Sequence, residues 1–182
     1  MFKKYSEIYH FISKFKEADL IKLHPKISII YRNYTDKIDL NLIKEIKFFC
    51  KKTKRKFYLA NEIKIAYQLN LDGSYIPSFN KSLKHNHYIK NNRFKLLGSA
   101  HNHKEIKIKQ KQNVQYIFLS PVFKIYKRKN FLGTNRFLRL KSQFNQKIVA
   151  LGGINKSNIR QLRMLNCYSF ASISFIKSLN LK

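Results

Sequence analysis

Residues 147–175 read KIVALGGINKSNIRQLRMLNCYSFASISF and contain two short apolar runs, each followed by a turn of small residues. The first run ends at Gly152 and Gly153, and the second ends just before Ser174. A segment of helical spacing lies between the two runs, so the stretch predicts a β-α-β unit with bare backbone amides at its strand ends. In a (β/α)₈ barrel the loops after the seventh and eighth strands often bind phosphate. The pattern therefore predicts a phosphorylated ligand at Gly152, Gly153 and Ser174.

The same alternation of apolar runs and helical spacing extends over the whole chain. Eight runs rich in Ile, Val, Phe and Tyr have the length of buried strands, namely 8–12, 27–32, 57–60, 74–77, 94–98, 114–119, 148–151 and 170–173. Helical spacing occurs over 40–51, 62–69, 103–110, 133–141 and 157–165. Residues 14–26 are expected to contain the first helix, and the polar segment 81–92 is expected to be mostly loop. The order predicts a compact (β/α)₈ barrel with abbreviated helices, because such barrels typically have ~250 residues.

Length and composition favour one domain over residues 1–182. With 182 residues and 44% hydrophobic content, the chain can bury one sizeable core. No apolar run approaches the roughly 20 residues that cross a bilayer, so we expect a cytoplasmic protein without a membrane partner. Cys50 and Cys167 lie far apart beside apolar neighbours and are expected to be reduced, packed thiols.

The charge is strongly basic, with 38 basic and 9 acidic residues and a net charge of +29. Such a charge is typical of proteins that bind nucleic acid. However, the basic residues are mostly lysines spread through every segment, together with an excess of Ile, Asn, Tyr and Phe, which indicates biased codon usage. Nucleic acid is therefore not the expected partner. The densest basic run, 51–56, follows a predicted helix and is expected to be its solvated last turn.

Several motifs occur in a fixed order at the ends of the predicted strands. They are Tyr31-Arg32, Leu59-Ala60-Asn61-Glu62, Leu71-Asp72-Gly73-Ser74-Tyr75, Gly98-Ser99-Ala100-His101-Asn102, Ser120-Pro121-Val122-Phe123 with Leu132-Gly133, and Ala150-Leu151-Gly152-Gly153-Ile154-Asn155. Together they resemble, in the same order, the strand-end motifs of the thiamine phosphate synthase and TenI family of small (β/α)₈ barrels. The resemblance covers nearly the whole chain and identifies it as a divergent, short member.

The resemblance implies a reaction and roles for particular residues. The family condenses a hydroxymethylpyrimidine diphosphate with a thiazole phosphate, giving thiamine phosphate and pyrophosphate. Its chemistry is dissociative, so magnesium and cationic groups stabilise the departing pyrophosphate. Carried over by motif, Arg32 lies near the diphosphate, Asn61 helps to hold the pyrimidine, and Ser99 faces the pyrophosphate. Gly153 and Ser174 match the thiazole-phosphate cradle.

The sequence departs from the family at the positions that hold magnesium. Where the family has two aspartates, this chain has Glu62 and, near the second position, the neutral Asn80. A hard divalent cation prefers charged oxygen ligands, so the resemblance implies Mg²⁺ binding at a weakened site. The glutamine and lysine of the family's Q-L-R-x-K strand appear here as Ile30 and Tyr34. The family's T-x-T-K loop after the sixth strand reads KIYKR at 124–128, where Lys127 or Arg128 is expected to supply the missing catalytic cation.

Histidines offer a second catalytic interpretation. His101 with His103, and His85 with His87, form H-x-H pairs, but no third ligand of suitable spacing is apparent, so zinc is not expected. His101 directly follows a predicted strand, where barrel enzymes place catalytic groups, and histidine exchanges protons near neutral pH. The TenI branch is associated with tautomerising a thiazole carboxylate phosphate, and its histidine corresponds to His101, which would act as general acid or base.

Some of these residues also suit purely structural roles. Asn61 or Glu62 could cap the following helix, because Asn is a favoured N-cap residue. Gly152 and Gly153 could relieve crowding at a strand end. Asp72 is expected to close the turn into the fourth strand.

Three functions therefore remain open from the sequence. A thiamine phosphate synthase is the leading interpretation, because Arg32, Asn61 and Ser99 are retained. A TenI-like tautomerase that uses His101 is the alternative, since the second metal position is neutral. A catalytically inactive barrel that binds a phosphorylated ligand or RNA is the third. The expected partners are a phosphorylated thiazole and a pyrimidine diphosphate, and a homo-oligomer is left open.

Overall fold

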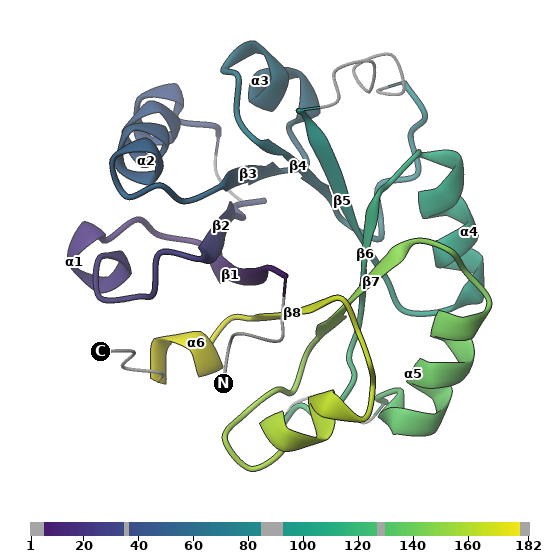
Figure 1. Ribbon diagram of the computed structural model, residues 1–182. Helices are drawn as coiled ribbons and strands as arrows, with labels where there is room; N and C mark the ends of the chain where they lie inside the picture. Colours follow the sequence, from purple (N-terminus) through teal and green to yellow (C-terminus); the bar gives the residue numbers. More distant parts are fainter. Residues whose placement is uncertain (1–5, 35–36, 85–92, 127–129, 179–182) are drawn as a thin grey trace.

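The computed structural model describes residues 6–34, 37–84, 93–126 and 130–178, and its eight strands close into one parallel barrel (Figure 1). Each strand pairs with its neighbours in chain order, and β1 completes the ring by pairing with β8. The strands are β1 (Ile8–Ile12), β2 (Ile27–Tyr31), β3 (Phe57–Ala60), β4 (Gly73–Ile76), β5 (Lys95–Ala100), β6 (Tyr116–Leu119), β7 (Lys147–Leu151) and β8 (Ser169–Ser172). Every one coincides with a predicted run to within two residues at either end. The predicted (β/α)₈ barrel is therefore confirmed.

Short helices surround this barrel (Figure 1). They are α1 (Glu17–Leu20), α2 (Leu40–Lys52), α3 (Ile63–Gln68), α4 (His103–Lys111), α5 (Gly133–Ser142), the 3₁₀ helix η3 (Ile159–Arg163) and α6 (Phe175–Ser178). The expected helix within 14–26 is present as the four residues of α1. Residues 81–84 form a loop, and the rest of the predicted loop 81–92 lies outside the described residues. The abbreviated helices explain how so short a chain completes the barrel.

The predicted helix over 157–165 is wrong in type and length, because the structure has a 3₁₀ helix of 5 residues there. Asparagine side chains compete locally for the backbone. The Asn155 Oδ1 atom accepts from the amides of Ser157 and Asn158, while the Asn158 Oδ1 atom accepts from the amide of Asn155. Such local bonds satisfy the first amides without an α-helical turn, so a short 3₁₀ turn forms instead.

The longest helix, α2, shows why its sequence is helical. The Asp39 side chain caps its first turn by accepting from the amides of Asn41 and Leu42, at 2.9 and 3.1 Å. Its buried face consists of Ile43, Ile46, Phe49 and Cys50. Lys51 and Lys52 lie in the last turn, where cations favour the helix dipole.

The basic run after α2 is not uniformly solvated, so the prediction for 51–56 is wrong at Arg55. This side chain is buried, and its guanidinium donates to the backbone oxygens of residues between α1 and β2: Leu20 at 3.1 Å, Leu23, His24 at 2.6 Å and Ile27 at 3.5 Å. Burial lowers the pKa of Arg55. The planar guanidinium can serve several carbonyl groups at once, which explains why an arginine is used here.

Aromatic rings fill the interior of the barrel. Tyr9, Phe11, Tyr75 and Phe118 belong to one buried cluster, and their ring centroids lie 4.9 Å apart for Tyr9 and Phe118 and 5.1 Å apart for Phe11 and Tyr75. Their edge-on contacts are the favoured geometry for aromatic pairs. Core packing therefore accounts for these aromatic residues, as expected, and the barrel is a solid core below its mouth.

Both cysteines are free, as predicted from their separation and neighbours. Cys50 is buried, and its burial raises the pKa of the thiol to about 12. Burial also raises the pKa of Cys167. In the described part of the chain, every helix is too short or too polar to cross a membrane.

Candidate functional site

Parallel strands direct their carboxyl ends to the same end of a barrel, which we call the mouth. The predicted site residues lie there: Arg32 after β2, Asn61 and Glu62 after β3, Asn80 after β4, Ser99 within and His101 after β5, Gly152 and Gly153 after β7, and Ser174 after β8. The predicted catalytic Lys127 lies outside the described residues. The topology thus collects these residues on one face, where Arg32, His101 and Ser174 line three separate hollows.

Arg32 lies over the aromatic core of the barrel. Its guanidinium carbon is 5.4 Å from the centroid of the Phe11 ring, a cation-π contact. Among the residues that the structure describes, no carboxylate forms an ion pair with Arg32. The side chain lines a hollow of about 260 Å³ together with Lys14, Lys16 and Asp19. A half-buried cation without a carboxylate partner is suited to bind an anion.

Ser99 faces the barrel interior and is buried. Its hydroxyl shares a hydrogen bond with the phenol of Tyr75. Burial raises the pKa of Tyr75, and this hydrogen bond and the positive charge of Arg32 oppose the increase. Tyr75 therefore stays protonated at neutral pH. Ser99 and Tyr75 form a hydrogen-bonded pair near the end of the barrel where Arg32 lies.

Asn61 and Asn80, which follow the neighbouring strands β3 and β4, are joined by a hydrogen bond at the mouth. The Asn80 Nδ2 atom donates to the Asn61 Oδ1 atom at 2.9 Å, and the Asn61 backbone amide donates to the Tyr75 oxygen at 2.8 Å. Asn61 has φ +68°, a left-handed conformation that asparagine tolerates well. The helix α3 takes Glu62 as its N-cap residue, without a capping bond from the side chain, so Asn61 is not the cap. Asn61 is thereby held by two neighbours at the mouth.

The residues at the predicted magnesium position fit an ion only in part. Of the predicted pair Glu62 and Asn80, only Glu62 has a carboxylate, and burial raises the pKa of this group. The Asn80 Oδ1 atom already accepts from the amide of Ser82 at 3.0 Å. Within the described ranges, no group of three or more His, Cys, Asp or Glu residues could hold a metal. Since Mg²⁺ is often bound by one carboxylate plus substrate phosphates, Glu62 fits an ion that arrives with a diphosphate, and the set does not fit a resident ion.

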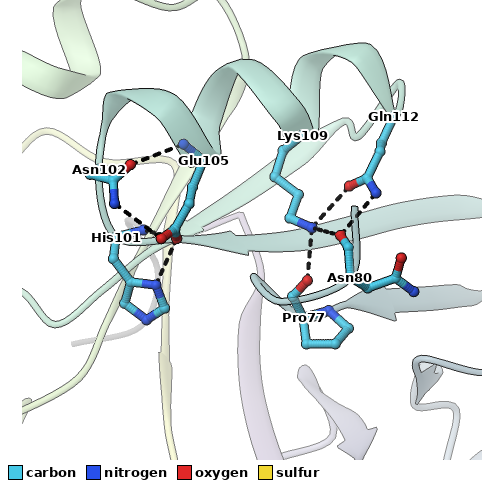
Figure 2. Close-up of polar contacts among 7 residues, drawn as sticks. All are labelled: Pro77, Asn80, His101, Asn102, Glu105, Lys109 and Gln112. Carbon is cyan, nitrogen blue, oxygen red and sulfur yellow. Dashed lines mark hydrogen bonds and ion pairs between the residues drawn. The ribbon is translucent and has the colours of Figure 1, made fainter. Parts of the chain in front are cut away.

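His101 is held by the first turn of α4 (Figure 2). The Glu105 Oε2 atom accepts from the His101 ring Nδ1 at 2.8 Å and from its backbone amide at 2.9 Å. Asn102 is the N-cap residue, and its side chain exchanges hydrogen bonds with Glu105. This arrangement places the proton on Nδ1 and leaves Nε2 as a proton acceptor. His101 therefore has the geometry of a carboxylate-oriented general base.

Glu105 is a candidate functional residue that the sequence analysis missed. The spacing of four residues between His101 and Glu105, at the start of a predicted helix, could have revealed it. His101 lines a hollow of about 620 Å³ with Ser120, Asn130 and Arg136, among others. This hollow combines a base, a hydroxyl, an amide and a cation. It is separate from the hollow that Arg32 lines.

Gly152 and Gly153 are tightly packed against the loop after β6. Both have positive φ, +89° and +72°. A Cβ atom on Gly152 would lie 2.8 Å from the Pro121 Cβ atom, and one on Gly153 would lie 2.4 Å from the Phe123 oxygen. The structural role predicted for these glycines, relief of crowding at the strand end, is therefore confirmed. Their role in binding phosphate remains a prediction.

Ser174 is exposed and lines a shallow hollow of about 480 Å³. The same hollow is lined by residues 154–157, which directly follow the two glycines. Asn155, Lys156 and Ser157 are among them, so the hollow has one cation and several hydrogen-bonding groups. The structure thus brings Ser174 beside the loop after β7, as the phosphate prediction requires.

The Asp72 side chain accepts from the amide of Phe57 at 2.9 Å, and this bond ties the turn before β4 to the start of β3. The structural role predicted for Asp72 is confirmed.

Eight parallel strands with polar side chains at their carboxyl ends define a small (β/α)₈ barrel of the kind that carries ligand sites at its mouth. Comparison with known families gives the particular group. The chain belongs to the thiamine monophosphate synthase family, whose pattern matches residues 19–176. No curated protein matches this sequence at a significant level.

Solved structures with the same fold include two thiamine phosphate pyrophosphorylases. The protein from Pyrococcus furiosus has a TM-score of 0.74 and 16% identity, with 96% of this chain and 91% of that chain covered. The protein from Bacteroides thetaiotaomicron has a TM-score of 0.63 and 19% identity, with 92% and 82% covered. FabK from Thermotoga maritima has a TM-score of 0.73 at 11% identity, with 94% and 59% covered. At such identities these likenesses show the fold alone.

Proposed function

We propose that the protein is a thiamine phosphate synthase that couples hydroxymethylpyrimidine diphosphate to thiazole phosphate. In this reaction the bond between the pyrimidine methylene carbon and the diphosphate oxygen breaks, and pyrophosphate leaves with the electron pair. The thiazole ring nitrogen then supplies the electron pair of the new carbon-nitrogen bond. Membership of the thiamine monophosphate synthase family supports this class of reaction.

The observation that carries the proposal is the position of Arg32. A guanidinium at the mouth, over an aromatic ring and without a carboxylate partner in the described residues, is suited to stabilise a departing pyrophosphate. Asn61 would hold the pyrimidine, and Ser99 would face the pyrophosphate. Gly152, Gly153 and Ser174 would take up the phosphate of the thiazole.

Magnesium enters this proposal as a companion of the diphosphate. Glu62 would be its protein ligand, while the Asn80 oxygen is engaged by the Ser82 amide. When bound, the ion would neutralise negative charge on the diphosphate. Lys127 remains the proposed additional cation.

A coupling assay tests the proposal. Purified protein is incubated with both substrates and Mg²⁺, and thiamine phosphate and pyrophosphate are measured. Arg32→Ala is expected to lower kcat/KM about a hundredfold, because it removes a cation that acts on developing charge. Arg163→Ala is the matched control, since Arg163 is exposed on η3, and it is expected to leave the rate unchanged. Folded wild-type protein that forms no product would refute the synthase.

The pairing of His101 with Glu105 favours a second candidate function. A carboxylate-oriented histidine suits proton transfer, as required to tautomerise a thiazole carboxylate phosphate. Here His101 would move a proton between two positions of the thiazole, and Glu105 would fix the ring tautomer.

Isomerisation of the thiazole carboxylate phosphate tests this candidate directly. His101→Gln is expected to lower the rate at least about a hundredfold, and Glu105→Gln is expected to lower it less. His103→Gln is the control, because His103 is exposed two residues further along. If His101→Gln isomerises the substrate at the wild-type rate, His101 is not the base.

A further inference from the structure

A buried lysine lies on α4, facing the loop after β4 (Figure 2). The Lys109 side chain is 0% exposed. Its Nζ atom donates to the backbone oxygen of Pro77 at 2.8 Å, the backbone oxygen of Asn80 at 2.9 Å and the Gln112 Oε1 atom at 2.9 Å. Three acceptors match the three donors of an ammonium group. Since no Lys109 surface reaches solvent, this group cannot touch a ligand.

The buried charge has a cost that the fold must offset. Transfer of an ammonium group from water to the interior is unfavourable unless its hydrogen bonds are replaced. The acceptors here are all neutral, and burial lowers the pKa of Lys109 to about 8, with the negative charge of Glu105 opposing the decrease. A polar cluster of this kind is weak support for stability, but it fixes geometry well.

The strand β5 leaves room for the lysine. A Cβ atom on Gly98 would lie 2.9 Å from the Lys109 Cδ atom and 3.1 Å from both methyl groups of Val114. Gly98 therefore makes space for the stem of Lys109 between β5 and α4. The position of the ammonium group is defined by the packing of its stem as well as by its acceptors.

Gln112 completes the attachment of the loop. Its Nε2 atom donates to the backbone oxygen of Asn80 at 3.0 Å and to the backbone oxygen of Ser82 at 2.9 Å. Lys109 and Gln112 together hold three carbonyl groups of the loop, those of Pro77, Asn80 and Ser82. The backbone of Asn80 is thus fixed from the side of α4.

The fixed loop in turn orients Asn61. The Asn80 Oδ1 atom accepts from the amide of Ser82, so its Nδ2 group is directed to the Asn61 Oδ1 atom. Because the carbonyl of Asn61 is occupied, its amide NH₂ is the group left to face a ligand. This part of the mouth therefore presents N–H donors, which suit a hydrogen-bond acceptor such as a ring nitrogen or a phosphoryl oxygen.

We propose that Lys109 and Gln112 are positioning residues, which hold the loop after β4 so that Asn61 presents its amide NH₂ to an acceptor group of the pyrimidine diphosphate. This inference rests on the proposed function for the identity of the ligand. In this inference, the role of Asn80 is to orient the side chain of Asn61.

The test compares Lys109→Met with Lys107→Met in the full chain. Methionine keeps an unbranched stem and removes the ammonium group, and Lys107 is an exposed residue on the same helix. Lys109→Met is expected to raise KM for the pyrimidine diphosphate about tenfold and to leave KM for the thiazole phosphate within about twofold. Lys107→Met is expected to change neither constant. Equal increases for both substrates would indicate general damage and overturn the inference.

A second set of measurements does not depend on catalysis. In Lys109→Met, the amides of residues 78–82 are expected to exchange hydrogen faster, and the side-chain NH₂ resonances of Asn61 are expected to shift. Gly98→Ala, which displaces the lysine stem, is expected to shift the same resonances. Unchanged exchange and unchanged Asn61 resonances in both variants would overturn the positioning role.

The double variant Lys109→Met/Gln112→Leu covers the case in which the single variant unfolds. Lys109→Met alone leaves the Gln112 Oε1 atom without its donor, and the double variant removes this buried polar atom as well. It is expected to fold and to show the same loss of loop protection. If wild-type protein couples no substrates, the proposed function fails, and the Asn61 resonances of these variants alone decide the positioning role.

Discussion

Two buried cations, Arg55 and Lys109, use backbone oxygens as partners at different places in the barrel. Arg55 donates to the carbonyl groups of the turn between α1 and β2, at the end opposite the mouth. Lys109 donates to the loop that follows β4 at the mouth. With only 9 acidic residues against 38 basic ones, this chain has few carboxylates to offer. Hydrogen bonds from a buried cation to backbone oxygens therefore stabilise the framework in one region and shape a candidate binding site in the other.

The chemistry of the two side chains matches this difference. The planar guanidinium of Arg55 serves four carbonyl groups, which suits a fixed turn. The ammonium of Lys109 serves three acceptors, which come from a loop and from Gln112. The comparison predicts that removing Arg55 mainly affects stability, while removing Lys109 mainly affects ligand binding.

Removal of Arg55 should have the largest effect on stability. Arg55→Met is expected to lower the free energy of unfolding by about 3 kcal/mol, because several buried carbonyl groups lose their donor. Urea unfolding followed by circular dichroism measures the change. Arg163→Met, on the exposed face of η3, is the control and is expected to change stability by less than ~0.5 kcal/mol. A loss equal to that of the control would break the comparison.

Gly153 tests whether the mouth also contains positions that are essential for stability. Gly153→Ala is expected to cost about 2 kcal/mol or more, because the added Cβ atom would lie 2.4 Å from the Phe123 oxygen at φ +72°. Gly133→Ala is a matched control, since Gly133 has φ +70° but its nearest heavy atom would be 4.0 Å away. This control is expected to cost about 1 kcal/mol. Thermal unfolding measures both losses of stability. If Gly153→Ala and Gly133→Ala lose the same amount, backbone strain alone, and not the close approach of Phe123, explains the need for glycine at 153.

The dependence of stability on pH separates the two cations further. Burial lowers the pKa of Lys109 to about 8 in the folded protein, whereas a lysine in the unfolded chain has a pKa of about 10.4. Between these values the unfolded state binds more protons, so the stability of wild type relative to Lys109→Met should rise with pH. The expected slope is at most about 1.4 kcal/mol per pH unit.

Urea unfolding of both proteins between pH 7 and pH 10 measures this difference. Arg55 keeps its proton over the whole range, so the difference between wild type and Arg55→Met should stay constant. If the difference in unfolding free energy between wild type and Lys109→Met does not change with pH, the pKa of Lys109 is not lowered in the folded protein.

The smallest expected effect is the coupling between the two cations. They share no hydrogen-bond partner, so the losses of stability in Arg55→Met and Lys109→Met should add to within about 0.5 kcal/mol in the double variant. A double-mutant cycle from unfolding data measures this. A larger coupling energy would mean that the turn before β2 and the loop after β4 act as one unit.

The strands and their order could be predicted from the sequence, because a barrel strand is buried on both faces and appears as a short apolar run. Residues at strand ends then fall at the mouth by topology alone, which is why Arg32, Asn61 and His101 could be placed there. The helix over 157–165 was predicted wrongly, since hydrophobic spacing does not register the side-chain bonds of Asn155 and Asn158.

The partners within the candidate site could not be predicted in the same way. Lys109 lies three residues after Ile106 and shares its buried face, yet lysine is ordinarily exposed, so spacing alone assigns it to solvent. Its acceptors at Pro77 and Asn80 come from 32 and 29 residues earlier in the chain. The pairing of β4 with β5 brings these segments together. The bond from Asn80 to Asn61 depends in the same way on the pairing of β3 with β4.

The aromatic filling of the barrel has a kinetic consequence. Because the rings of Tyr9, Phe11, Tyr75 and Phe118 fill the barrel interior, a ligand of Arg32 must enter and leave from the side of the mouth. If the protein is the proposed synthase, pyrophosphate released at Arg32 would compete with the next diphosphate, and turnover should slow as that by-product accumulates. Removal of the by-product by an added pyrophosphatase should restore the initial velocity.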